Sequence, residues 1–216
     1  MGEMLKRIFI DTNVFVHWIL YKKISEDRPI DKSQMWVRYS RYKSDYEFIE
    51  QIHETHDKTA HYFTSDLAIA EIVFSIYREI KFRKMYLDGV PFSAFVNKIV
   101  DSKSFVLEQG DIEAIRGLVF LFLQQYDIFN KPGEKRKVQL LHDEHDFLLI
   151  SELVIKENIR TQDSILTSTA VSAKCDYFVT SDIELKKLNK SSIKELKGLE
   201  FLSPNEIEIK LKSSAL

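Results

Sequence analysis

Four acidic residues of this 216-residue chain stand where a carboxylate is costly. Asp11 lies between two apolar runs in "LKRIFIDTNVFVHWIL", and Glu71 lies inside "LAIAEIVF". Asp163 opens the small-residue segment "DSILTSTAVSA", and Asp182 ends the apolar segment "YFVTSD". A carboxylate in apolar surroundings needs a compensating charge, and several carboxylates brought together repel one another. A divalent cation that prefers oxygen ligands, Mg²⁺ or Mn²⁺, would resolve both problems.

Each of these acids also has an ordinary structural interpretation when it is taken alone. Asp11 would begin a turn or cap the following helix, and Glu71 would be a boundary residue that reaches solvent. Asp163 would be a first-turn acid favoured by the helix dipole, and Asp182 would be an N-cap. The four placements together favour a shared site over four unrelated explanations.

The elements that must position these acids alternate between strands and helices. We expect strands at residues 7–10, 104–109, 177–182 and 199–203. We expect helices at 14–24, 64–86, 90–100, 111–129, 142–159, 161–175 and 183–190, further helical segments within 25–62, and a last turn at 204–209. This alternation predicts an α/β fold with a central parallel sheet flanked by helices. Ligands bind at the carboxyl ends of parallel strands, and Asp11 and Asp182 converge there if their two strands are neighbours.

Composition excludes several classes of protein. Apolar residues make up 44% and charged residues 30%, which is ordinary for a globular protein, and the net charge of −2 gives no overall basic field. Six glycines form no phosphate-binding loop motif, which argues against a nucleotide-binding enzyme. The one cysteine fits a reducing compartment. With no apolar stretch long enough to span a bilayer and no room for a signal peptide, we expect a cytoplasmic protein without membrane contact.

Four segments of the chain resemble the PIN domain ribonucleases, a family of metal-dependent nucleases. They are "FIDTNVF", "SDLAIAEIVFSI", "IRTQDSILTSTAVSAKCDYFVTSDIEL" and "LEFLSPNEI". The resemblance implies one PIN-like, Rossmann-like domain over residues 1–216 and a metal-dependent endoribonuclease that leaves a 5′-phosphate and a 3′-hydroxyl. It implies that the catalytic metal site consists of the four acids, supported by two polar residues: Asp11, Glu71, Asp163 and Asp182, with Asn13 and Ser181.

The spacing of the acids departs from that of the compact toxin-type members of this family. Glu71 follows Asp11 by 60 residues (71 − 11), and Asp163 follows Glu71 by 92 (163 − 71). Residues of about 25–60 and 111–145 therefore resemble helical insertions. RNA is the expected partner, and a homodimer or an antitoxin-type protein partner is possible.

The first insertion holds a cluster of basic and aromatic residues that would suit single-stranded RNA. Its basic members are Arg38, Arg41 and Lys43, and Tyr39 and Tyr42 lie among them. Basic side chains bind the phosphates of a strand, and aromatic rings stack on its bases. A solvated charged face remains the alternative interpretation.

Two other functions compete with the endoribonuclease. One is a PIN-like module that binds RNA or takes part in assembly without turnover. The other, a phosphatase of the haloacid dehalogenase type, is disfavoured because "DTN" lacks the second aspartate of that family's nucleophile motif.

The remaining candidate ligands are weaker. Glu108, at the end of a predicted strand, is a reserve fifth acid. His142 and His145 in "HDEHD" could share a metal, although a solvated helix start is favoured. His17 follows Asn13 by one helical turn and could contact a phosphate, although a packing role is favoured. The other histidines, His53, His56 and His61, are expected at the surface.

Overall fold

A parallel sheet forms the centre of the protein. The computed structural model describes residues 5–26, 39–54, 60–91, 107–125 and 138–214. These residues form one five-stranded, all-parallel sheet in the order β3-β2-β1-β4-β5. The strands are β1 (Lys6–Ile10), β2 (Ala60–Ser65), β3 (Val138–Leu141), β4 (Tyr177–Val179) and β5 (Glu200–Leu202). The predicted α/β class with a parallel sheet is therefore confirmed.

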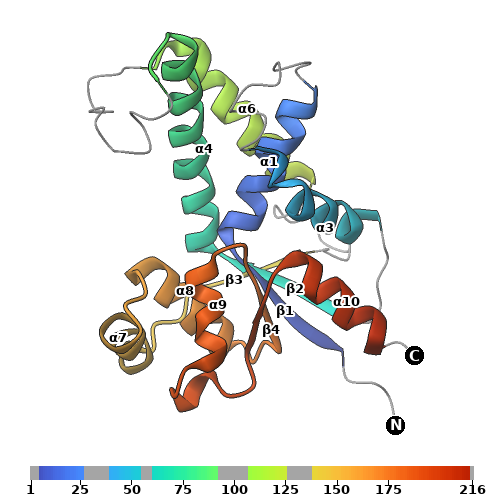
Figure 1. Ribbon diagram of the computed structural model, residues 1–216, viewed down its shortest axis with the longest axis vertical. Helices are drawn as coiled ribbons and strands as arrows, with labels where there is room; N and C mark the ends of the chain where they lie inside the picture. The colour runs from blue at the N-terminus through green and yellow to red at the C-terminus, as the bar shows by residue number, and fades with distance from the viewer. Residues whose placement is uncertain (1–4, 27–38, 55–59, 92–106, 126–137, 215–216) are drawn as a thin grey trace.

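Helices flank this sheet and connect its strands (Figure 1). They are α1 (Thr12–Glu26), α3 (Lys43–Glu54), α4 (Asp66–Leu87), α6 (Gln109–Gln125), α7 (Phe147–Lys156), α8 (Thr161–Ser172), α9 (Ile183–Lys186) and α10 (Pro204–Ser214). Two 3₁₀ turns, η2 (Lys187–Lys190) and η3 (Lys194–Leu196), precede β5. The long helix α4 and helix α6 pack together and rise away from the sheet.

The alternation of side chains along the strands divides the core into two layers. Ile8 and Ile10 of β1 point into a cluster formed with α1, α3, α4, α6 and α10. Phe9, between them, points into the opposite cluster, formed with α7, α8 and α9. Both faces of β1 are thus buried, as is usual for a central strand of a parallel sheet. A polar group at the end of β1 is consequently enclosed by packed elements.

The strand order places a topological switch point between β1 and β4. The chain runs from β1 outward through β2 to β3, and then returns to add β4 and β5 on the other side of β1. In open α/β sheets the crevice beyond the carboxyl ends of such a strand pair is the usual ligand site. Asp11 follows β1 directly, and Thr180, Ser181 and Asp182 follow β4. β1 and β4 are neighbours, which is the condition under which Asp11 and Asp182 were expected to converge.

Two strands were not predicted from the sequence. β2 lies in a polar region that was expected to be helical, and β3 lies within the predicted helical insertion at 111–145. The pairing of β2 with β1 and of β3 with β2 supplies the stability that their local sequences do not indicate. No strand forms at the described residues 107–109, because α6 begins at Gln109.

Several predicted helices have different bounds. The helix expected at 142–159 begins only at Phe147, where the Asp146 side chain caps α7 by accepting from the amides of Leu148 and Leu149. The last helix is longer than the predicted turn and reaches Ser214. The helix expected at 90–100 lies almost entirely outside the described residues. Arg38 also lies outside them. Among the residues that the structure describes, no helix combines the length and apolarity needed to cross a bilayer.

Candidate metal centre

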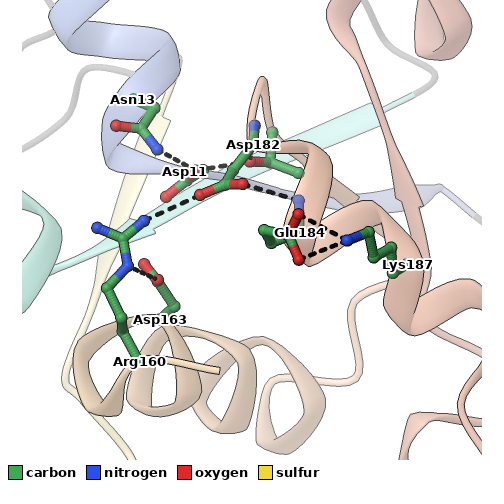
Figure 2. Close-up of polar contacts among 8 residues, drawn as sticks. Asp11, Asn13, Arg160, Asp163, Asp182, Glu184 and Lys187 are labelled. Carbon is green, nitrogen blue, oxygen red and sulfur yellow. Dashed lines mark hydrogen bonds and ion pairs between the residues drawn. The ribbon is translucent and has the colours of Figure 1, made fainter. Parts of the chain in front are cut away.

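Asp11 is the buried centre of the candidate site. It is only 1% exposed, and its Oδ2 accepts hydrogen bonds from Thr180 Oγ1 at 2.7 Å and from Asn13 Nδ2 at 3.3 Å (Figure 2). Burial raises the pKa of Asp11 to about 7, the Thr180 bond opposes this, and the charges of the other three predicted acids raise it further. Asn13, the predicted supporting residue, therefore contacts Asp11 directly.

Asp182 reaches the same crevice from the end of β4. Its amide donates to Thr180 Oγ1 at 3.0 Å, so that Thr180 connects Asp182 to Asp11. Its Oδ1 accepts from the Glu184 amide at 2.8 Å and caps α9, while its Oδ2 faces Arg160. The N-cap interpretation of Asp182 is thus correct, and it does not exclude a role in the site, because the two oxygens have different partners.

Glu71 enters from α4, whose start is fixed by the Ser65 N-cap at the end of β2. Its Oε2 accepts a hydrogen bond from Thr12 Oγ1 at 2.9 Å, and Thr12 directly follows Asp11 in the chain. Burial raises the pKa of Glu71, and the charge of Asp163 adds to this. Among the described residues, no Lys or Arg forms an ion pair with Glu71. Its placement in an apolar helix is therefore not explained by a direct cationic partner.

Asp163 lies in the first turn of α8 and shares a cation with Asp182. Arg160 Nε lies 3.1 Å from Asp163 Oδ2, and Arg160 Nη2 lies 3.0 Å from Asp182 Oδ2, as Figure 2 shows. The Arg160 side chain is 73% exposed, so the guanidinium reaches these acids from the solvent side. Burial raises the pKa of Asp163, Arg160 opposes the shift, and Asp182 adds to it.

The small residues of α8 allow this close approach. Ser164, Thr167 and Ser168 are buried, and the Ser168 and Thr169 hydroxyls accept from the amides of Asp146 and Glu144 in the segment before α7. The helix is thereby held close to the segment that follows β3. The sequence prediction that small side chains let this helix lie close to its neighbours is consistent with this packing.

The side chains around Asp11 suit a hard cation by their chemistry, although the acids are not arranged around one point as metal ligands would be. The four carboxylates and their Thr and Asn neighbours offer only oxygen and amide groups, which Mg²⁺ and Mn²⁺ prefer. Within the described residues, no three His, Cys, Asp or Glu side chains form a group that could hold a metal ion. Two of the predicted ligands, Asp163 and Asp182, are engaged by Arg160 instead.

A fifth acid near this site was missed in the sequence. Asp143 follows β3 at the same edge of the sheet, and its charge raises the pKa of Glu71. Its Oδ2 accepts from the Leu67 amide at 2.7 Å, while its Oδ1 is buried without a hydrogen-bond partner among the described residues. The signal was present in "HDEHD", but the unrecognised strand β3 hid its position at a strand end. The two neighbouring histidines are exposed there, and His142 contacts Asp66.

The reserve acid Glu108 was wrongly assigned. It precedes α6, its side chain is 82% exposed, and it lies 3.2 Å from Lys84 at the far end of α4. Lys84 also pairs with Asp111 at 2.8 Å. Since residues 107 and 108 do not end a strand of the sheet, Glu108 is not delivered to the site.

Ser181 contacts a residue that sequence reasoning did not single out. Its hydroxyl lies 2.7 and 2.8 Å from the two carboxylate oxygens of Asp45, in the first turn of α3. Asp45 is 1% exposed and its Oδ2 also contacts His17 Nδ1. Ser181 thus directly precedes Asp182 in the chain, but its hydroxyl contacts Asp45, which belongs to the first predicted insertion.

The predicted RNA-binding cluster is only partly described. Arg41 is exposed, and Lys43, at the start of α3, pairs with Glu47 at 3.3 Å, with both side chains more than half exposed. The expected stacking role of Tyr39 is wrong, because Tyr39 is buried in the core and its hydroxyl donates to Glu79 at 2.8 Å. Tyr42 stacks on His17 instead.

Comparison with known proteins places the chain beside an archaeal relative. No protein-family model matches the chain. An uncharacterized protein of Archaeoglobus fulgidus is 32% identical over 89 residues, which cover 41% of this chain and 73% of that protein. This similarity covers most of the relative, and the chain belongs to the same family as that Archaeoglobus protein.

Proposed function

We propose that the protein is a metal-dependent endoribonuclease of the PIN domain type. The observation that carries the proposal is the meeting of Asp11, Glu71, Asp163 and Asp182 at the switch point of the sheet, where each of the other three acids raises the pKa of Asp11. Four carboxylates from β1, α4, α8 and the end of β4 have no common structural task at this place. The four-segment resemblance to PIN domain ribonucleases supports the same function.

We assign the following roles to the residues of the site. Asp11, Glu71, Asp163 and Asp182 would hold one or two Mg²⁺ or Mn²⁺ ions, which supply an activated water and charge stabilisation for cleavage of an RNA phosphodiester. Thr180 and Asn13 orient Asp11 through hydrogen bonds, and Thr12 orients Glu71. Arg160 compensates the negative charges of Asp163 and Asp182. It would have to release both side chains if both acids bound metal.

A module that binds RNA without cutting it is the second candidate. The observation that favours it is the pair of contacts from Arg160, which compensates two of the four acids without any metal. A group of acids whose charges are compensated in this way could take part in RNA binding or assembly without catalysis. The two candidates differ in whether RNA is hydrolysed, so cleavage and binding must be measured side by side.

The test is a cleavage assay on end-labelled RNA of mixed sequence, with Mn²⁺, Mg²⁺ or EDTA. The comparison is between the wild type and Asp182→Asn, because asparagine can still cap α9 while it lacks the charge. Asp88→Asn, an exposed acid beyond α4, is the control. We expect Mn²⁺-dependent cleavage in the wild type and control, and its loss in Asp182→Asn. Binding without cleavage would favour the second candidate, and neither activity would refute both.

A further inference from the structure

His17 presents a polar ring beside the candidate site. It lies one turn after Asn13 on α1, so both residues occupy one face of that helix. Its Nδ1 contacts Asp45 Oδ2, and its side chain remains 21% exposed. Since an ionised carboxylate can only accept, Nδ1 carries the hydrogen, and Nε2 is the atom left for another partner.

Two contacts hold the His17 ring in place. Asp45 is almost completely buried, and within the described residues His17 is the one basic side chain in contact with it. The Tyr42 ring stacks on the imidazole with centroids 3.8 Å apart and an angle of 8° between the planes. With hydrogen on both ring nitrogens, His17 is a cation that can donate from Nε2–H to an anion.

The position of this cation matters because of its neighbours. Ser181 donates to Asp45 and directly precedes Asp182, so the His17–Asp45 pair is joined to the acidic crevice through one residue. The crevice carries Asp11, Glu71, Asp163 and Asp182, which would repel the phosphates of an approaching strand. If the partly exposed His17 ring binds as a cation at this border, it offsets that repulsion for a phosphate next to the one that is cut.

We propose that His17 binds a backbone phosphate of single-stranded RNA through Nε2–H, with Asp45 and Tyr42 fixing the ring. The proposal rests on the proposed function, because it assumes that an RNA strand crosses this crevice. It gives the first insertion region a positioning role: α3 supplies Asp45, which orients His17 without touching the substrate itself. His17 is thus a substrate-binding residue, and Asp45 is a positioning residue.

The test uses His17→Asn, because the asparagine amide can replace Nδ1–H toward Asp45 while nothing replaces Nε2. The probe is a fluorescein-labelled twelve-nucleotide oligouridylate, and its binding is followed by fluorescence anisotropy in EDTA over a range of salt concentrations. We expect about tenfold weaker binding and a loss of roughly 0.7 from the slope of log affinity against log salt, the value for one phosphate contact on a single strand. His61→Asn, an exposed histidine at the start of β2, should leave both quantities unchanged.

Asp45→Asn provides the second variant. It should weaken binding in the same direction, and the double variant with His17→Asn should be no weaker than His17→Asn alone, because both act on one contact. An unchanged affinity and salt slope in His17→Asn would overturn the proposal.

Cleavage separates this failure from that of the proposed function. If the wild type cuts RNA with Mn²⁺ and His17→Asn has an unchanged KM, only the phosphate contact is refuted. If His17→Asn weakens binding but no protein cuts RNA, the contact stands and the nuclease function fails. If the wild type neither binds the probe nor cuts RNA with Mn²⁺, both fail.

Discussion

Asp11 offers the sharpest test of the candidate site, because its burial costs stability that a single substitution should return. Its pKa is raised from 3.8 to about 7, mainly by burial and then by Asp163, Glu71 and Asp182. Below pH 3.8 the carboxyl is protonated in the folded and the unfolded chain. As the pH rises toward 7, the unfolded chain releases this proton and the folded chain retains it, so the stability associated with Asp11 falls and is lost above about pH 7.

The size of this loss follows from the two pKa values. At ~1.36 kcal/mol per pKa unit, a rise from 3.8 to about 7 corresponds to on the order of 4 kcal/mol of folding free energy at pH 8. Asp11→Asn removes the charge, keeps the size, and retains an oxygen that can accept from Thr180. In EDTA at pH 8 the variant should therefore be more stable than the wild type, with a midpoint of thermal unfolding raised by roughly 10 °C. At pH 4 the two should unfold alike.

The assay is urea and thermal unfolding followed by circular dichroism at pH 4, 6 and 8, with and without Mn²⁺. Mn²⁺ should stabilise the wild type far more than Asp11→Asn, and cleavage should be lost in the variant. Asp88→Asn serves as the exposed control and should follow the wild type at each pH. A variant that is less stable than the wild type at pH 8, or that keeps full cleavage, would refute the reasoning.

Three further predictions concern Glu71, Arg160 and the basic cluster of the first insertion. Glu71→Gln should abolish cleavage, and the free energy of unfolding of the metal-free protein at pH 8 should stay the same or rise, because the raised pKa of Glu71 indicates a negative charge that is not fully compensated. A loss of about 3–5 kcal/mol in urea unfolding would instead reveal a structural ion pair. Arg160→Gln should lower the melting temperature in EDTA, because Asp163 and Asp182 lose their shared cation, and Mn²⁺ should restore it; equal melting curves with and without Mn²⁺ would contradict a metal site here. The combined change of Arg38, Arg41 and Lys43 to Ala should reduce the salt slope of RNA binding by about 2, measured by anisotropy, whereas an unchanged slope would mark a solvated surface.

The local sequence was sufficient for the elements with strong patterns. The apolar run before Asp11 predicted β1. The segment from residue 161 to Asp182 predicted the first residues of α8 and β4 correctly, although both elements end earlier than predicted. Buried parallel strands and small-residue helices have unambiguous patterns, and an acid that interrupts such a pattern is conspicuous. The four acids could therefore be selected, and the convergence of Asp11 with Asp182 anticipated, before any contact was known.

The weaker elements depended on pairing that the sequence does not display. β2 and β3 are held in place by neighbouring strands, and without β3 the position of Asp143 at the edge of the sheet could not be inferred. Glu108 was misplaced for the same reason, because a residue at a strand end reaches the site only if the strand belongs to the sheet.

By itself, then, the sequence determined the α/β class and the choice of the four candidate acids, because local apolar patterns and costly charges are properties of short segments. The tertiary structure alone decided which side chains satisfy those charges. Arg160 joins Asp163 to Asp182. Asp45 contacts His17, which lies 28 residues earlier in the chain, and Ser181, which lies 136 residues later. Such contacts depend on how α1, α3 and the end of β4 pack together, and no local pattern encodes the direction in which a polar side chain will find its partner.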